Sequence, residues 1–366
     1  MDDDNNYDNI PLQRFLENTI KARPEFELRT MLSLHKSESL KKLARLYRMK
    51  RYASAKKSQM VEHLYSALTD SEHIESMLLL SDDDEYSFFE EVVKQEKAEM
   101  KASEASSKPY YYYRKLYFLE IYNMSGRISF VVPDTVKDIY FRLCNTSFPE
   151  TRNCYGAANS FATAFANIYG VVDVDYFTEF INCRLQKKIE DIKLINILEG
   201  FIWVRNATYN IFGDLLIHSE LDKHTIETEI GDYLVEASND EVYKIESERD
   251  CVPMKPLPPE EILKYTDPNY FEITQAHEDL ACFMEEHDPE IKNTPILSII
   301  NLRELNKILR QTDDHNYSIP YFDTRKFEAD ENAMKTMNNL IDGVNKHTRK
   351  WSKNGWMPIE LEMPPG

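Results

Sequence analysis

The stretch LKKLARLYRMKRYASAKKSQMVEHLYSAL, residues 40–68, determines how the rest of the sequence is interpreted. Its apolar side chains recur at helical spacing in two groups: Leu40, Leu43 and Leu46, then Met60, Val61, Leu64 and Leu68. Between the groups, residues 49–58 are too basic, and too poor in large apolar side chains, to continue one buried stripe. The spacing therefore predicts a helix, an extended basic loop and a second helix.

The charge of this stretch is opposite to that of the whole chain. Residues 36–57 contain nine Lys or Arg and a single acidic residue, Glu38, whereas the net charge of the chain is −19. A surface of that sign repels nucleic acids and anionic membranes. Any contact with a polyanion must therefore be local, and residues 36–57 are where we expect it.

Lys and Arg side chains neutralise phosphates and release counterions, which gives a salt-sensitive affinity that does not depend on base sequence. The side chains expected to contact DNA or RNA are Lys41, Arg45, Arg48, Lys50, Arg51, Tyr52, Lys56 and Lys57. Tyr52 is included because its ring could stack on a base or a sugar. The alternative is a solvated basic face that pairs with the chain's own carboxylates or docks an acidic partner protein.

Residues 40–68 resemble the helix–extended-loop–helix of SAP-type motifs and of the N-terminal subdomain of the Rho termination factor. The resemblance lies in the apolar positions of both helices and in the Lys56-Lys57-Ser58 end of the loop. It departs at residues 48–53, where a Gly usually ends the first helix. The resemblance implies a module that binds nucleic acid or serves as a small docking element.

Composition indicates a soluble protein of two or three domains. The chain has 366 residues, of which 42% are hydrophobic and 29% charged. Its start, MDDDNNYDN, is acidic and lacks the apolar stretch of a secretion signal, so we expect a cytoplasmic protein without a membrane segment. Five scattered cysteines without a CxxC pair fit reduced thiols better than disulfides or a zinc site.

Two stretches mark expected boundaries. Residues 97–109, KAEMKASEASSKP, are small and polar and predict a linker or an exposed helix tail. Residues 253–259 contain four prolines, which favours an extended linker. After the first boundary, the cluster Tyr110–Tyr113 could stack on bases, but aromatic residues favour strands, so we expect the start of a strand packed on one face.

The central region has the order of elements of a winged helix. Helical patterns at 155–169, 174–185 and 189–199 precede β-like runs at 201–209 and 211–218. A hairpin that follows helices occurs twice, near 82–132 and 155–218, and the first has a turn at residues 123–126. The third helix would enter the DNA groove, but its sequence, IEDIKLINILE, is acidic. We therefore expect a structural or protein-binding winged helix.

Beyond residues 40–68 the chain resembles a group of uncharacterised Firmicutes proteins that carry such an N-terminal module. The resemblance lies in residues 128–134, ISFVVPD, in residues 168–172, IYGVV, and in a pattern from Asn345 to Leu361 that includes Thr348, Arg349, Trp351 and Gly355. In several relatives a zinc-binding SEC-C tail follows; here only Met363-Pro-Pro-Gly366 follows, so no zinc is expected. This resemblance implies an architecture rather than an activity.

Catalytic motifs are missing from the sequence. It contains no HExxH, GxSxG, GxxxxGK[ST] or GxGxxG, so we expect neither an enzyme nor a cofactor. The carboxylates of Asp82, Asp83 and Asp84 lack the Gly turn and distal Glu of a calcium loop, and they predict a helix cap instead. Trp351 and Trp356 could anchor a partner, but burial of Trp351 against the C-terminal core is the expectation.

These observations predict a mainly α protein with small β-hairpins, of the α+β class. Its expected parts are an N-terminal extension (1–29), a helical SAP-like and Rho-N-terminal-like module (30–100), a winged-helix-like α+β region (110–250) and a C-terminal helical domain (260–366). The expected function is non-enzymatic nucleic-acid binding through the basic loop. The alternative is a protein-interaction adaptor whose basic module docks an acidic partner.

Overall fold

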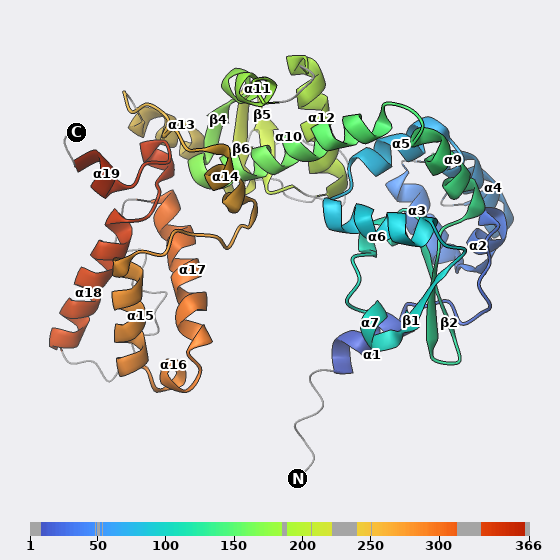
Figure 1. Cartoon of the computed structure of the whole chain (residues 1–366), viewed down its shortest axis with the longest axis horizontal. Coiled ribbons are helices and arrows are strands. Elements are labelled where there is room, and N and C mark those ends of the chain that lie inside the picture. Colours follow the sequence, from blue (N-terminus) through green and yellow to red (C-terminus); the bar gives the residue numbers. More distant parts are fainter. Residues whose placement is uncertain are drawn as a thin grey trace, which may run out of the picture. The chain divides into compact units, whose positions relative to one another are not determined.

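The chain is mainly helical, with two small antiparallel sheets (Figure 1). The structure is a computed structural model that describes residues 9–47, 49, 52, 54–184, 189–205, 207–221, 240–249, 251–312 and 331–362. This architecture confirms the predicted class, mainly α with small β-hairpins. None of the helices in these ranges is long and apolar enough to cross a membrane.

Two compact units divide the chain, residues 1–156 and residues 157–366. Helix α10 (Phe148–Tyr169) begins in the first unit and ends in the second. The four-part division expected from the sequence stays a prediction.

The first unit starts with six helices: α1 (Asn9–Glu17), α2 (Leu28–Leu34), α3 (Ser37–Leu46), α4 (Lys57–Leu68), α5 (Ser71–Leu79) and α6 (Asp83–Val93). Carboxylates cap the starts of α2 and α6. Glu27 accepts backbone N–H bonds at the start of α2, and the Asp82 carboxylate accepts one from Glu85 N at 2.8 Å at the start of α6. The predicted capping role of Asp82 is thereby confirmed.

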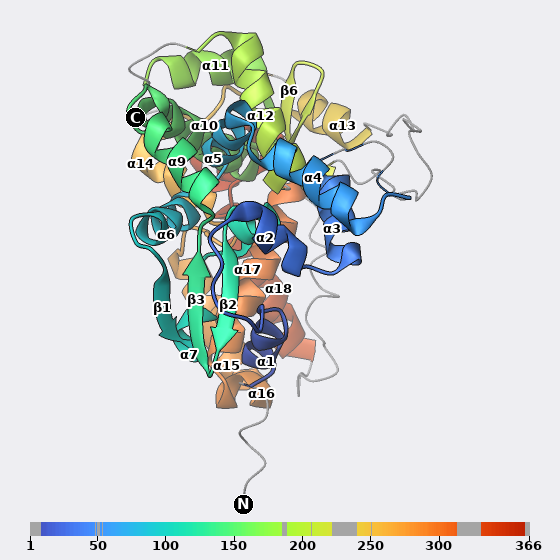
Figure 2. The same ribbon diagram turned by 90° about the vertical axis from the view of Figure 1, so that its right-hand side faces the viewer.

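A three-stranded antiparallel sheet follows in this unit, built from β1 (Ala98–Lys101), β2 (Glu120–Met124) and β3 (Arg127–Val131). β3 lies between β1 and β2 (Figure 2). Ser125 and Gly126 both have positive φ, 54° and 81°, so the β2–β3 turn is of the type I′ that suits a two-residue hairpin. Helices α7 (Ala102–Ala105) and α8 (Tyr111–Lys115) lie between β1 and β2 in sequence, and α9 (Asp134–Leu143) follows β3.

The second unit repeats this order of elements. After α10 come β4 (Val171–Asp173), α11 (Val174–Asn182), α12 (Asp191–Arg205), β5 (Tyr209–Phe212) and β6 (Leu215–His218). Its sheet has the order β4-β6-β5, all antiparallel. Both units therefore contain helix–strand–helix–helix–strand–strand, with the third strand between the first and the second.

The remaining helices complete the second unit: α13 (Asp240–Glu248), α14 (Pro259–Ile262), α15 (Gln275–His287), α16 (Pro289–Asn293), α17 (Ile296–Gln311), α18 (Glu331–Lys346) and α19 (Pro358–Glu362). Helices α15 to α18 share a core that includes Leu280, Met284, Leu305 and Ile341. A second cluster joins Val171 and Ile217 to Trp351. The C-terminal residues thus help to form the core around the sheet.

Several local predictions were wrong. Residues 97–109 are not a linker, because they form β1 and α7, with Ala98 and Ala105 buried. The Tyr cluster forms α8 rather than a strand, because Tyr113 is buried and stacks on Phe89 with ring centroids 4.4 Å apart. Residues 201–205 belong to α12 rather than to a strand. In each case tertiary packing overrides the local propensity.

Candidate nucleic-acid interface

The two helices predicted within residues 40–68 form as α3 and α4, and we call residues 36–68 the basic module. Leu40, Leu43 and Ala44 are the buried residues of α3, and Met60, Val61, Leu64 and Leu68 are those of α4. Each set recurs at three- and four-residue spacing, so each helix buries one face. The apolar pattern therefore sets which side chains face outward, and these include most of the cations.

The described cations of the basic module gather at the start of α3, along its length and at the start of α4. Lys36, Lys42, Arg45, Lys56 and Lys57 are exposed, and Lys41 is half-buried. Two of these side chains have fixed partners. Arg45 Nε donates to Tyr52 Oη at 3.3 Å, a bond that raises the pKa of Arg45. Lys57 Nζ donates to Ser33 O at 2.7 Å, next to the end of α2.

Of the predicted site residues, Lys41, Arg45, Tyr52, Lys56 and Lys57 have described positions in the basic module, and their role in binding stays a prediction. The predictions on Arg48, Lys50 and Arg51 lie outside the described residues.

The described carboxylates form no ion pair with the described cations of the basic module. Nearby Arg29 on α2 differs, because its Nε lies 2.9 Å from Glu62 Oε1 and its guanidinium covers the Tyr65 ring. The module therefore presents cations whose charge remains available to a polyanion.

Helix α12 contains most of the segment 189–199, which was predicted to be the third helix of the winged helix. Ile192 and Trp203 on this helix are 68% and 72% exposed. Its sequence contains four charged residues: Asp191, Lys193, Glu199 and the C-terminal Arg205. Helix α12 therefore exposes large apolar side chains, and the expectation that it contacts protein stays a prediction.

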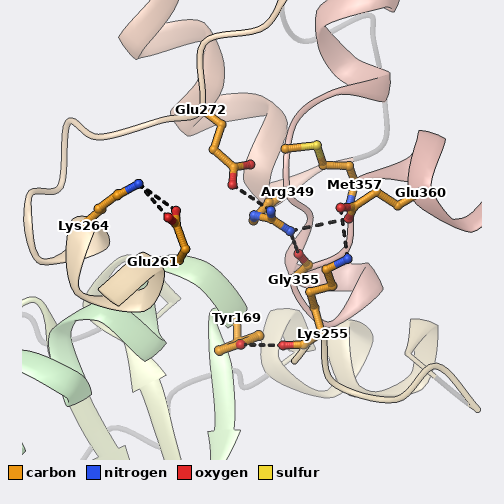
Figure 3. Close-up of polar contacts among 9 residues, drawn as sticks. All are labelled: Tyr169, Lys255, Glu261, Lys264, Glu272, Arg349, Gly355, Met357 and Glu360. Atoms are coloured by element: carbon orange, nitrogen blue, oxygen red, sulfur yellow. Dashed lines mark hydrogen bonds and ion pairs between the residues drawn. The ribbon is translucent and has the colours of Figure 1, made fainter. Parts of the chain in front are cut away.

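Arg349, from the terminal pattern, has a structural role. Its guanidinium is buried and donates to Glu272 at 2.7 Å, to Gly355 O at 2.9 Å and to Glu360 at 3.5 Å (Figure 3). Glu360 also accepts from Lys255 Nζ at 3.0 Å and from Met357 N at 3.0 Å. The pattern thus joins residues 253–258, which precede α14, to the last helix.

Trp351 and Lys350 of the same pattern are both buried. Trp351 is 1% exposed, and its Nε1 donates to Asn167 O at 3.2 Å. The expected burial of Trp351 is confirmed, but its partners are Val171 and Ile217 of the second sheet rather than the core of the C-terminal helices. Lys350 Nζ donates three hydrogen bonds, to Leu309 O, Thr312 O and Asn345 Oδ1.

The part of the chain that the structure describes contains no cluster of side chains suited to bind a metal ion. There, no three His, Cys, Asp or Glu side chains lie close enough together to hold a metal ion.

One basic feature was not predicted from the sequence. One pocket is lined by Arg14 on α1 and by Arg114 and Lys115 on α8. Arg14 lies about 100 residues before the other two in the chain. The signal available in the sequence was the run Tyr110-Tyr-Tyr-Tyr-Arg-Lys115, which puts cations directly after the aromatic cluster.

Comparison of the chain with protein-family models, with curated proteins and with solved structures finds no significant match. The resemblances to SAP-type, Rho-N-terminal-type and Firmicutes proteins therefore stay predictions.

Proposed function

We propose that this protein binds nucleic acid without catalysing a reaction, and that the basic module contacts the phosphate backbone. The observation that carries the proposal is a group of cations that form no ion pair with any described Asp or Glu, in a chain of net charge −19. Arg45, Lys56 and Lys57 are the described members that we expect to touch phosphates. Such contacts give affinity and position rather than base specificity.

The repeated topology supports a winged-helix-like arrangement for both units. In each, a sheet of order first–third–second follows the same succession of helices. Because α12 presents Ile192 and Trp203 rather than cations, we assign phosphate contact to the basic module and not to this helix.

The test is binding of duplex DNA, single-stranded DNA and RNA over a salt series. The variant Lys36→Gln/Arg45→Gln/Lys56→Gln/Lys57→Gln removes four cations from the module. The control variant Lys292→Gln/Arg303→Gln/Lys335→Gln/Lys346→Gln removes the same residue types from exposed positions of the C-terminal helices. Both variants carry the same net charge, so only the position of the lost cations differs.

On duplex DNA, each phosphate contact contributes about 0.9 to the slope of log K against log salt. We expect the module variant to flatten this slope by roughly 2 to 4 and the control variant to leave it nearly unchanged. Equal effects of the two variants would show that the module is not the site. If no nucleic acid binds at low salt, the proposal is wrong, and an acidic partner protein becomes the ligand to seek.

A further inference from the structure

A pocket of about 810 Å³ lies between α1 and the segment that leads into α8, entirely within the first unit. Its cations are Arg14, Arg114 and Lys115, and none of the described residues that line it is acidic. In a chain with 63 acidic and 44 basic residues, three cations without a carboxylate in one hollow form a local anion-binding environment.

One of these cations, Arg114, is held in place by a backbone oxygen next to α1. Arg114 Nη2 donates to Asn18 O, just beyond the end of α1, and Asn18 Nδ2 donates to Arg14 O at 2.8 Å. No ion pair with a described Asp or Glu engages Arg14, Arg114 or Lys115. The guanidinium of Arg114 is therefore positioned at the pocket while its charge remains unneutralised.

Aromatic rings form the other part of the same pocket. Phe15 is buried, and its ring centroid lies 5.6 Å from that of Tyr110, which is half-buried. Tyr111 is 74% exposed, although its neighbours Tyr112 and Tyr113 are buried. A large ring left in solvent beside a cationic hollow is a surface on which a planar base can stack.

A second pocket, of about 520 Å³, adjoins the first and shares Asn18 and Arg114 with it. It reaches Lys36 at the start of the basic module, and its cations also include Lys21. The buried carboxylate of Glu120 in this pocket lies 3.0 Å from His35 Nε2. The carboxylate of Glu17 also lines this second pocket, so the cations Lys21, Lys36 and Arg114 connect the basic module to the aromatic pocket alongside two acidic side chains.

We infer that this pocket receives a base and its flanking phosphates from a single-stranded nucleic acid, with Tyr111 as the stacking platform. The inference rests on the proposed function and specifies its substrate class. Duplex DNA keeps its bases stacked on one another, so it offers phosphates to the basic module but no free base to Tyr111. Single strands offer both. A free nucleotide carries the same chemistry, and the experiment separates it from a strand.

The experiment measures binding of a single-stranded oligonucleotide, a duplex of equal length and adenosine monophosphate to the full chain. Its variants are Tyr111→Ala, Tyr111→Phe and, as a matched control, Tyr176→Ala, which removes an exposed tyrosine from α11. Loss of one base stack weakens single-strand binding roughly 5- to 150-fold. We expect this loss for Tyr111→Ala only, with Tyr111→Phe close to the native affinity and duplex binding unchanged.

Three outcomes would overturn the inference. If Tyr111→Ala leaves single-strand affinity unchanged while the basic-module variant loses it, the pocket is not used and the proposed function still stands. If Tyr111→Ala weakens duplex and single strand equally, base stacking is not the cause. If adenosine monophosphate binds and depends on Tyr111 while strands do not, the pocket belongs to a free nucleotide.

Discussion

Substitution of Gly170 by Ala tests how tightly the terminal pattern packs on the second sheet. Gly170 follows α10 with φ of +74°, and a Cβ built there would lie 2.4 Å from Cδ2 of Trp351. The left-handed backbone costs a non-glycine residue about 1–2 kcal/mol. Overpacking against a buried ring adds roughly 1–3 kcal/mol. We therefore expect Gly170→Ala to lower the free energy of unfolding of this unit by about 2–5 kcal/mol.

The measurement is urea unfolding followed by tryptophan fluorescence. All three tryptophans, Trp203, Trp351 and Trp356, lie in the second unit, so the signal reports that unit alone. The control is Gly213→Ala in the β5–β6 turn, where φ is +57° but nothing lies within 4 Å of the added Cβ. Gly213→Ala should therefore lower the free energy of unfolding only by the cost of the left-handed backbone, about 1–2 kcal/mol. Equal losses in the two variants would refute the claim that contact with Trp351 dominates.

Two further predictions concern buried charge in the second unit. Arg349→Met should lower the free energy of unfolding by about 3–5 kcal/mol, because the Glu272 carboxylate would lose its buried partner. The control Lys264→Met breaks the exposed pair with Glu261 and should change the free energy of unfolding in urea by less than about 1 kcal/mol. Similar losses in the two variants would contradict this reasoning. Burial, assisted by the charge of Arg310, lowers the pKa of His218 from 6.5 to about 4. Protonation thus favours the unfolded chain, and the contribution of His218 to stability is complete above pH 6.5 and is lost as the pH falls toward 4. Between pH 7 and pH 5 the protein should therefore lose about 2 kcal/mol of unfolding free energy through His218. The variant His218→Gln should lack this part of the pH dependence, and a pH dependence equal to that of the native protein would contradict the lowered pKa of His218.

The sequence was most informative where apolar residues recur at helical spacing. The apolar spacing at Leu40, Leu43, Met60 and Leu64 correctly predicted two helices that each bury one face. The first hairpin was also predictable, because the turn with Ser125-Gly126 separates two β-rich runs, whereas the second was expected in the right region but with its strands misplaced. These signals are local, so a single sequence carries them.

Non-local packing explains the errors. Ala98 pairs with Phe130 in the sheet, and no feature of a small polar stretch reveals a strand partner more than 30 residues away. The aromatic pocket has the same origin, because Arg14 and Arg114 meet only once α1 and α8 are in place. The four consecutive tyrosines are evident in the sequence, but the sequence does not indicate which of their rings are buried and which are exposed to solvent.

The position of Trp351 so late in the sequence bears on how the protein is made. Val171 of β4 packs in one cluster with Trp351, 180 residues further along the chain. A ribosome that adds about 5–20 residues per second synthesises that interval in roughly 10–40 s. Throughout this time the apolar face of the nascent sheet lacks its covering ring. Chaperones that shield exposed apolar surface would therefore encounter this half of the protein during translation, and its final packing must follow release of the late residues from the exit tunnel.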